Sequence, residues 1–199
     1  MIAFLLLSCA ATSQEVPVIV TRDQWGAKEV GPGAKEHQIV RITIHHTGVK
    51  SNANRSLEEK LRGLQAFSQR KDKLSNGKDK PAWPDVPYHY YISIDGRIGE
   101  GRPWNLVGDT NTEYDPTGHL LIVVEGEFGI EDPTAKQMDS LREMLDWATE
   151  KFHVAPDLVQ SHRDYAKTDC PGQSLTRQMP RLRNYLKGNL ILKARRSGL

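Results

Sequence analysis

The chain has 199 residues, of which 38% are hydrophobic and 26% charged, so it can bury one core and is too short to favour two domains. Its net charge is only +2 and its basic and acidic residues are interleaved, so nothing in the composition predicts the concentrated positive surface of a nucleic-acid-binding protein. We expect one domain over 20–187, preceded by an N-terminal tail, 1–19, and followed by a basic tail, 188–199.

A short apolar run, 1–11, opens the chain and contains Leu6-Leu7-Ser8-Cys9. It is far below the roughly 20 residues that a membrane span needs. The four residues resemble the lipobox of bacterial lipoproteins, in which a signal peptide is cleaved before a cysteine that becomes lipidated. No Lys or Arg precedes the run, so either the true start lies upstream or the run is an uncleaved terminus. We expect a mature protein that begins at an acylated Cys9.

The segment 12–38 is rich in proline and glycine, and only the short run 16–20 could form a strand. We therefore expect a loop-rich arm laid over the core. Trp25 follows a polar turn and is expected to anchor this arm.

The first strong strand is expected at 38–46. Alternation with a period of two places Val40, Ile42 and Ile44 on one face of that strand. His45 has the opposite parity, so we expect its side chain on the other face, toward a surface that could be a cleft.

Two amphipathic helices are expected, at 54–70 and 134–151, because apolar residues recur in both at spacings of three and four. Both begin with a capping-box pattern, in which Ser or Thr is followed three residues later by Glu or Gln. The two pairs are Ser56 with Glu59 and Thr134 with Gln137.

Between these helices, the polar stretch 71–87 reads as a long connection. A strand at 88–94, the turn Asp95-Gly96 and a returning strand at 97–101 predict a hairpin. The nearly continuous apolar run 120–124 is typical of a central strand covered on both faces.

The remainder comprises a short strand at 158–161 and a third helix at 173–186, in which Pro180 marks the true first turn or kinks the helix. The tail beyond it shows no periodicity. Strands that alternate with helices, together with one hairpin, predict a single α/β domain with a central mixed β-sheet flanked by helices.

The stretch Ser161 to Gly172 places His162 and Cys170 eight positions apart in a segment rich in turn formers. Imidazole and thiolate are both zinc ligands, and three protein ligands with one open position would make a catalytic site. Metal binding would also explain an unpaired thiol in an oxidising compartment. His45 and His162 both lie at the carboxyl ends of expected strands, where such sheets carry their chemistry.

Five segments in order resemble the type 2 N-acetylmuramoyl-L-alanine amidases, the family that also contains the peptidoglycan recognition proteins and the phage amidase-lysozyme. The resemblance covers about 20–187 and rests on the combination of segments. The segments are Ile44-His45-His46-Thr47, Asp85-Val86-Pro87-Tyr88-His89-Tyr90, Asp95 to Arg102, Trp104-Asn105-Leu106-Val107-Gly108 and Ser161 to Gly172.

The resemblance implies one Zn²⁺ ion held by His45, His162 and Cys170, with a water in the fourth position. Spacing alone does not distinguish His45 from His46, but strand parity and the motif both favour His45. It further implies catalytic roles for Tyr88, which would orient water or substrate, and for Thr168, which would stabilise the oxyanion. We expect His46, Thr47 and Trp83 to support a ligand or contact substrate.

The sequence departs from the family pattern at two places. One branch of the family uses a glutamate in the central strand as general base, where this chain has Val123, with Glu125 two residues later. We therefore assign the chain to the branch that uses Tyr88. Many relatives carry a histidine at the position of Thr110, and we expect its loss to affect substrate contacts.

The expected function is zinc-dependent hydrolysis of the amide between N-acetylmuramic acid and the L-alanine of peptidoglycan stem peptides. The expected partners are peptidoglycan or muropeptides, and a membrane through lipidated Cys9. We expect a monomer in the periplasm of the bacterial cell envelope that binds no nucleic acid. One alternative is a recognition protein that holds peptidoglycan without cutting it. Another is a structural zinc site, which would need His46 or Asp169 as a fourth ligand.

Overall fold

A six-stranded mixed sheet forms the centre of the computed structural model, which describes residues 16–73 and 77–196. Its strand order is β1-β6-β5-β7-β2-β8. The strands are β1 (Ile19–Val20), β2 (Arg41–His46), β5 (Tyr90–Ile92), β6 (Ile98–Glu100), β7 (His119–Val124) and β8 (Val159–Ser161). The helices are α1 (Arg22–Trp25), α2 (Leu57–Ser68), α3 (Ala135–Lys151), α4 (Gln173–Thr176) and α5 (Met179–Arg196), with 3₁₀ turns η1 (Pro156–Leu158) and η2 (His162–Asp164).

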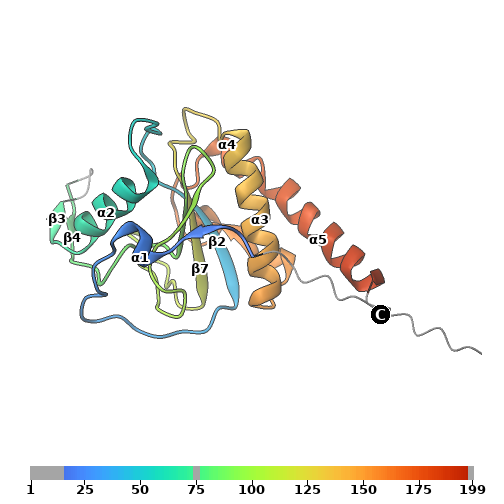
Figure 1. Ribbon diagram of the computed structural model, residues 1–199, viewed down its shortest axis with the longest axis horizontal. Coiled ribbons are helices and arrows are strands. Elements are labelled where there is room, and N and C mark those ends of the chain that lie inside the picture. The colour runs from blue at the N-terminus through green and yellow to red at the C-terminus, as the bar shows by residue number, and fades with distance from the viewer. Residues whose placement is uncertain (1–15, 74–76, 197–199) are drawn as a thin grey trace, which may run out of the picture.

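Helices cover both faces of this sheet, with α1 and α2 on one side and α3 and α5 on the other (Figure 1). The central strand β7 contributes to both hydrophobic clusters: Ile122 packs with residues of α3 and α5, and Val123 packs with residues of α1 and α2. All six residues of β7 are buried, as expected for a strand covered on both faces. The expected single α/β domain with a mixed sheet is confirmed.

The parallel register of three strands brings the future site residues to one edge. Strand β2 runs parallel to both β7 and β8, and Ile44 pairs with Ser161. His45 and His162 each follow directly on that pair in sequence. Their strands therefore deliver the two imidazoles to the same end of the sheet, as the carboxyl ends of parallel strands do.

Both predicted capping boxes are present. Ser56 accepts from the backbone of Glu59 at the start of α2, and Thr134 accepts from that of Gln137 at the start of α3. The hairpin is also confirmed, because β5 and β6 are antiparallel and Gly96 adopts a φ of 85° in their turn. A positive φ there is the reason that the turn needs glycine.

The N-terminal arm is more regular than expected. The polar turn is a short helix, α1, and Trp25 is its fully buried end, 0% exposed, with Nε1 donating to the carbonyl of Glu100 at 2.7 Å. The expected strand at 38–46 begins only at Arg41, and Val40 is 51% exposed. Cys9 lies outside the described residues.

The long connection contains a small hairpin that was not predicted, formed by β3 (Asp72–Lys73) and β4 (Asp79–Lys80). Two-residue strands of charged residues carry no alternation of apolar and polar side chains by which a sequence pattern could identify them.

The bounds expected for the third helix, 173–186, are wrong, whereas the alternative that Pro180 marks the true first turn is confirmed. The segment forms two helices, and Pro180 lies in the first turn of α5, where a missing N–H costs no hydrogen bond. Helix α5 also continues through most of the expected tail, to Arg196. Contacts with α3 stabilise this extension, because Asn189 and Lys193 both bond to Asp146.

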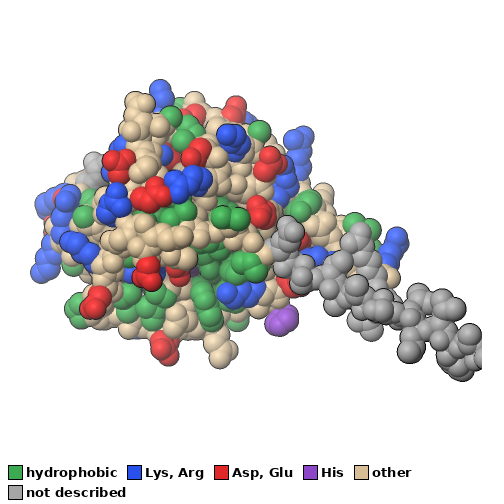
Figure 2. All heavy atoms as spheres, viewed as in Figure 1, with side chains coloured by type: hydrophobic (Ala, Val, Ile, Leu, Met, Phe, Trp, Pro, Cys, Tyr) green, Lys and Arg blue, Asp and Glu red, His purple; other side chains and the backbone are tan. Residues whose placement is uncertain are grey.

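Among the described residues, no helix combines the length and apolar character that crossing a bilayer requires. Basic, acidic and apolar side chains are interspersed over the face of the molecule in Figure 2.

Candidate metal centre

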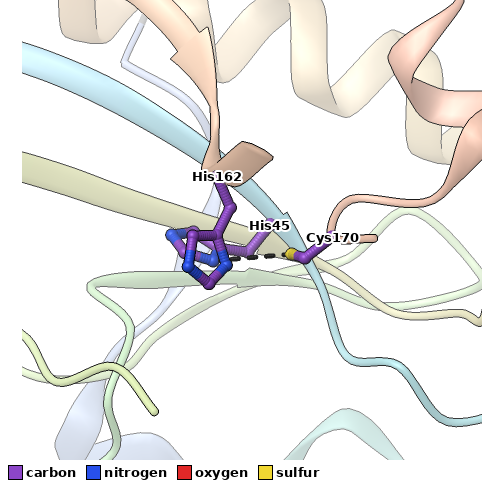
Figure 3. Close-up of side chains that lie close together, drawn as sticks. All are labelled: His45, His162 and Cys170. Carbon is purple, nitrogen blue, oxygen red and sulfur yellow. Dashed lines mark hydrogen bonds between the residues drawn. The ribbon is translucent and has the colours of Figure 1, made fainter. Parts of the chain in front are cut away.

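Three side chains from separate segments converge at the carboxyl edge of the sheet (Figure 3). His45 is in β2, His162 opens η2 directly after β8, and Cys170 lies in the loop before α4. One ligand atom from each lies within 4.8 Å of the others, and Cys170 Sγ is 3.7 Å from His45 Nδ1. The structure therefore brings together the three residues predicted as ligands.

Cys170 is held by backbone contacts. The backbone N–H of His46 donates to its sulfur at 3.4 Å, and the backbone N–H of Arg163 donates to its carbonyl at 3.0 Å. Its own N–H donates to Thr168 Oγ1 at 3.2 Å. These contacts fix the sulfur against the end of β2, next to His45.

The remaining imidazole nitrogens face hydroxyl groups from the segment before β7. Thr112 Oγ1 lies 2.7 Å from His162 Nε2, and the hydroxyl of Tyr114 lies 3.5 Å from His45 Nε2. Neither Thr112 nor Tyr114 was predicted. Both lie in an irregular segment without periodicity, so no pattern in the sequence indicated them.

This arrangement fits a zinc ion. His162 Nδ1 is buried and has no hydrogen-bond partner, which is costly unless something else satisfies it. Two imidazole nitrogens and a thiol are a donor set that zinc takes, and hydroxyl groups on the far nitrogens are the outer contacts that orient such ligands.

The cluster has three candidate ligands and no fourth among the described His, Cys, Asp and Glu residues. His46, the rival of His45, points elsewhere: its Nδ1 accepts from the backbone N–H of Phe128 at 3.3 Å. Asp169 is likewise not part of the cluster. The geometry favours an open position over a closed structural site.

Burial sets the charges of the three groups. It lowers the pKa of His45 well below the ordinary value, with His162 contributing next, and it lowers the pKa of His162 to about 4. Both imidazoles are therefore neutral at neutral pH, the form in which histidine binds a metal. Burial raises the pKa of the Cys170 thiol to about 12, so this sulfur becomes a thiolate only beside a compensating cation.

Tyr88 lies beside the cluster, with its ring centroid 5.3 Å from that of His45. Burial, with contributions from Cys170 and Tyr114, raises the pKa of Tyr88 above its ordinary value, so its hydroxyl keeps its proton. Thr168 is placed against Cys170 by the hydrogen bond described above. Both residues predicted to act on substrate therefore adjoin the cluster.

Of the three residues expected to support a ligand or contact substrate, only His46 contacts the cluster of His45, His162 and Cys170 directly. The backbone of His46 contacts the cluster, whereas the hydroxyl of Thr47 accepts from Gly126 N at 3.0 Å and joins the end of β2 to the loop after β7. Trp83 packs over Lys80, whose Nζ lies 4.6 Å from its ring, and its backbone N–H donates to Ser68. The structure does not place Trp83 against the three ligands.

The structure shows no general base at or beside the glutamate position of the other branch, because Val123 has no basic group and Glu125 is engaged in other contacts. Val123 is fully buried in the cluster on the α2 side of the sheet. Glu125 is buried and bonded to Lys60 Nζ at 2.8 Å and to the backbone N–H groups of Asn52 and Ile94.

Comparison with known proteins agrees with this architecture. The family model described as N-acetylmuramoyl-L-alanine amidase matches residues 35–173. Peptidoglycan recognition protein 4 of Homo sapiens is 30% identical over 161 residues, covering 80% of this chain, and the match spans only 40% of that protein's length.

Two solved structures are similar in fold. Drosophila peptidoglycan recognition protein SD is 28% identical, with a TM-score of 0.69 over 83% of this chain and 94% of its own. The N-acetylmuramoyl-L-alanine amidase LysC from Clostridium intestinale is 24% identical, with a TM-score of 0.66 over 85% of this chain and 99% of its own.

Proposed function

The chain belongs to the N-acetylmuramoyl-L-alanine amidase family, and we propose that it is a zinc-dependent enzyme that hydrolyses the amide between N-acetylmuramic acid and the L-alanine of peptidoglycan stem peptides. Peptidoglycan or muropeptides would be its substrates. The observation that carries the proposal is the convergence of His45, His162 and Cys170, with one buried imidazole nitrogen left without a hydrogen-bond partner.

A zinc ion bound there would supply a Lewis acid and lower the pKa of a bound water to about 7, which would provide a nucleophile for amide hydrolysis near neutral pH. The chain supplies the rest. Tyr88 keeps its proton and can donate it in a hydrogen bond that orients the water or the scissile carbonyl. Thr168 Oγ1 accepts from Cys170, which leaves its hydroxyl proton available for the oxygen on which negative charge develops.

Recognition of peptidoglycan without cleavage is a second candidate, which the names of the related proteins favour. Against it stands Cys170, since a protein that only binds needs neither a thiol beside two histidines nor an open metal position. The two candidates predict the same binding partner and different products.

Replacement of Cys170 decides between them. Cys170→Ser removes one ligand with little change in volume, so the variant should fold, lose zinc and release no stem peptide from soluble muropeptides. Circular dichroism checks the fold and metal analysis checks the zinc. Hydrolysis by a zinc-free, folded C170S at the wild-type rate would contradict the proposal.

We propose a location in the bacterial cell envelope, in the periplasm, where peptidoglycan is found. The support is the sequence Leu6-Leu7-Ser8-Cys9, which resembles a lipobox and would give an acylated Cys9. A single acyl chain binds membranes weakly, so stable attachment requires the several chains of a bacterial lipoprotein. Mass spectrometry of the native N-terminus tests this, and an unmodified Met1 would refute it.

A further inference from the structure

The segment between β6 and β7 presents two threonine hydroxyls to His162. Thr112 Oγ1 lies 2.7 Å from His162 Nε2, and Thr110 Oγ1 lies 2.8 Å from Thr112 Oγ1. We propose that Thr112 is the positioning residue that holds His162 by Nε2, in the orientation and tautomer that leave Nδ1 free to bind the metal. This inference rests on the proposed function, since it takes zinc as the ion that His162 binds.

The donor and acceptor inventory explains why the hydroxyl pair selects one tautomer. Each threonine hydroxyl has one proton to donate and lone pairs to accept. Thr112 can donate to Thr110 Oγ1 and then accepts from the imidazole, which places the imidazole proton on Nε2. His162 Nδ1 is then the unprotonated nitrogen. It is also the buried atom that has no hydrogen-bond partner.

Thr110 is the acceptor that completes this arrangement. Its Oγ1 also accepts from the backbone N–H of Thr112 at 3.2 Å, which fixes the two hydroxyls relative to each other. Position 110 is the one at which this chain departs from the many relatives that carry a histidine. In this chain it carries a hydroxyl whose described contacts are with Thr112 and, at 3.5 Å, with His162 Nε2.

The segment that carries the hydroxyls is anchored to the core. Arg102, only 1% exposed, forms an ion pair with Asp109 and donates to the carbonyl of Val107. The backbone N–H of Asp109 also donates to the carbonyl of Pro87, at 3.2 Å. These contacts within the protein hold the start of the segment that carries Thr112, as a positioning residue needs.

Zinc affinity separates this role from a merely structural one. Thr112→Val keeps the shape and removes the hydroxyl, so zinc should bind about 10- to 100-fold more weakly in competition with a chromophoric chelator. Thr112→Ser restores the hydroxyl and should bind within about threefold of wild type. Thr117→Val is the matched control: its hydroxyl is in the same segment, is exposed and bonds to Asp115. It should leave affinity unchanged.

A second readout needs no metal. Imidazole ¹⁵N NMR of the metal-free wild type should show His162 protonated at Nε2, and T112V should show a mixture of tautomers. Wild-type zinc affinity in folded T112V, or a proton on Nδ1 in the wild type, would overturn the role of Thr112. If the wild type binds no zinc at all, the proposed function fails and the NMR result still decides the role of Thr112.

Discussion

Replacing Lys60 with Met should lower the free energy of unfolding by about 3 kcal/mol, because it leaves the Glu125 carboxylate buried without its cation. Lys60 Nζ lies 2.8 Å from Glu125 Oε2, and the two side chains are only 8% and 5% exposed. Loss of one partner of a buried pair typically costs about 3–5 kcal/mol. The lower end applies here because Glu125 keeps two backbone N–H donors, those of Asn52 and Ile94.

Removing the charge of the other partner, Glu125, should lower the free energy of unfolding further than removing that of Lys60. Glu125→Gln keeps the shape but has only one accepting oxygen, whereas Asn52 N–H and Ile94 N–H donate to different oxygens of Glu125. It also leaves a buried ammonium facing a neutral amide, so we expect a loss of about 4–5 kcal/mol in the free energy of unfolding. The double variant K60M/E125Q buries no net charge. The loss in free energy of unfolding in the double variant should be smaller than the sum of the losses in the two single variants by at least about 2 kcal/mol.

Urea unfolding, followed by tryptophan fluorescence, gives the free energy of unfolding of all three variants. Lys187→Met is the matched control, since Lys187 pairs with Asp157 at 2.6 Å on the surface, with the two side chains 47% and 72% exposed. That variant should change stability by less than about 1 kcal/mol. A K60M variant within 1 kcal/mol of wild type, or strict additivity in the double variant, would refute this reasoning.

Three further predictions concern the site and its surroundings. Tyr88→Phe should bind zinc as wild type does but lower kcat about 10²- to 10³-fold, because a donor to the reacting atoms is lost; unchanged kcat would exclude the role. Thr168→Val should lower kcat about tenfold or more and Thr168→Lys should raise it, since an ammonium stabilises an oxyanion better than a hydroxyl; equal kcat values on muropeptides would argue against contact with the oxyanion. Burial lowers the pKa of His89 to about 3 from 6.5, so the native state stays neutral while the unfolded chain takes up a proton below pH 6.5. Protonation of His89 in the unfolded chain should therefore lower the free energy of unfolding by up to about 1.4 kcal/mol per pH unit as the pH falls from 6.5 toward 3. In His89→Gln, the free energy of unfolding measured in urea should depend less steeply on pH by the same amount. An unchanged slope between pH 6 and 4 would be inconsistent with a neutral buried imidazole.

The sequence pattern was most informative where backbone periodicity determines the direction of a side chain. Alternation along 38–46 separated His45 from Ile44 and favoured His45 over His46, and the structure places His45 Nδ1 near Cys170 while His46 faces Phe128. The capping boxes and the Asp-Gly turn were equally local and were correctly predicted. These features depend on residues that are near neighbours in the chain.

Features that depend on contacts between distant segments were not predictable in this way. Thr112 meets His162 across 50 positions of sequence, through a loop without periodicity. The extension of α5 beyond Leu186 depends on α3, because Asp146 receives bonds from Asn189 and Lys193. The residues beyond Leu186 show no periodicity of their own, so the sequence alone did not predict this extension.

Digestion of purified sacculi tests the central claim most directly. Zinc-loaded protein should release free stem peptides that begin with L-alanine and leave intact glycan strands, as identified by mass spectrometry. A chelator should abolish the release and added zinc should restore it. Protein that sediments with sacculi but releases no stem peptide, with or without zinc, would contradict the account and favour recognition without cleavage.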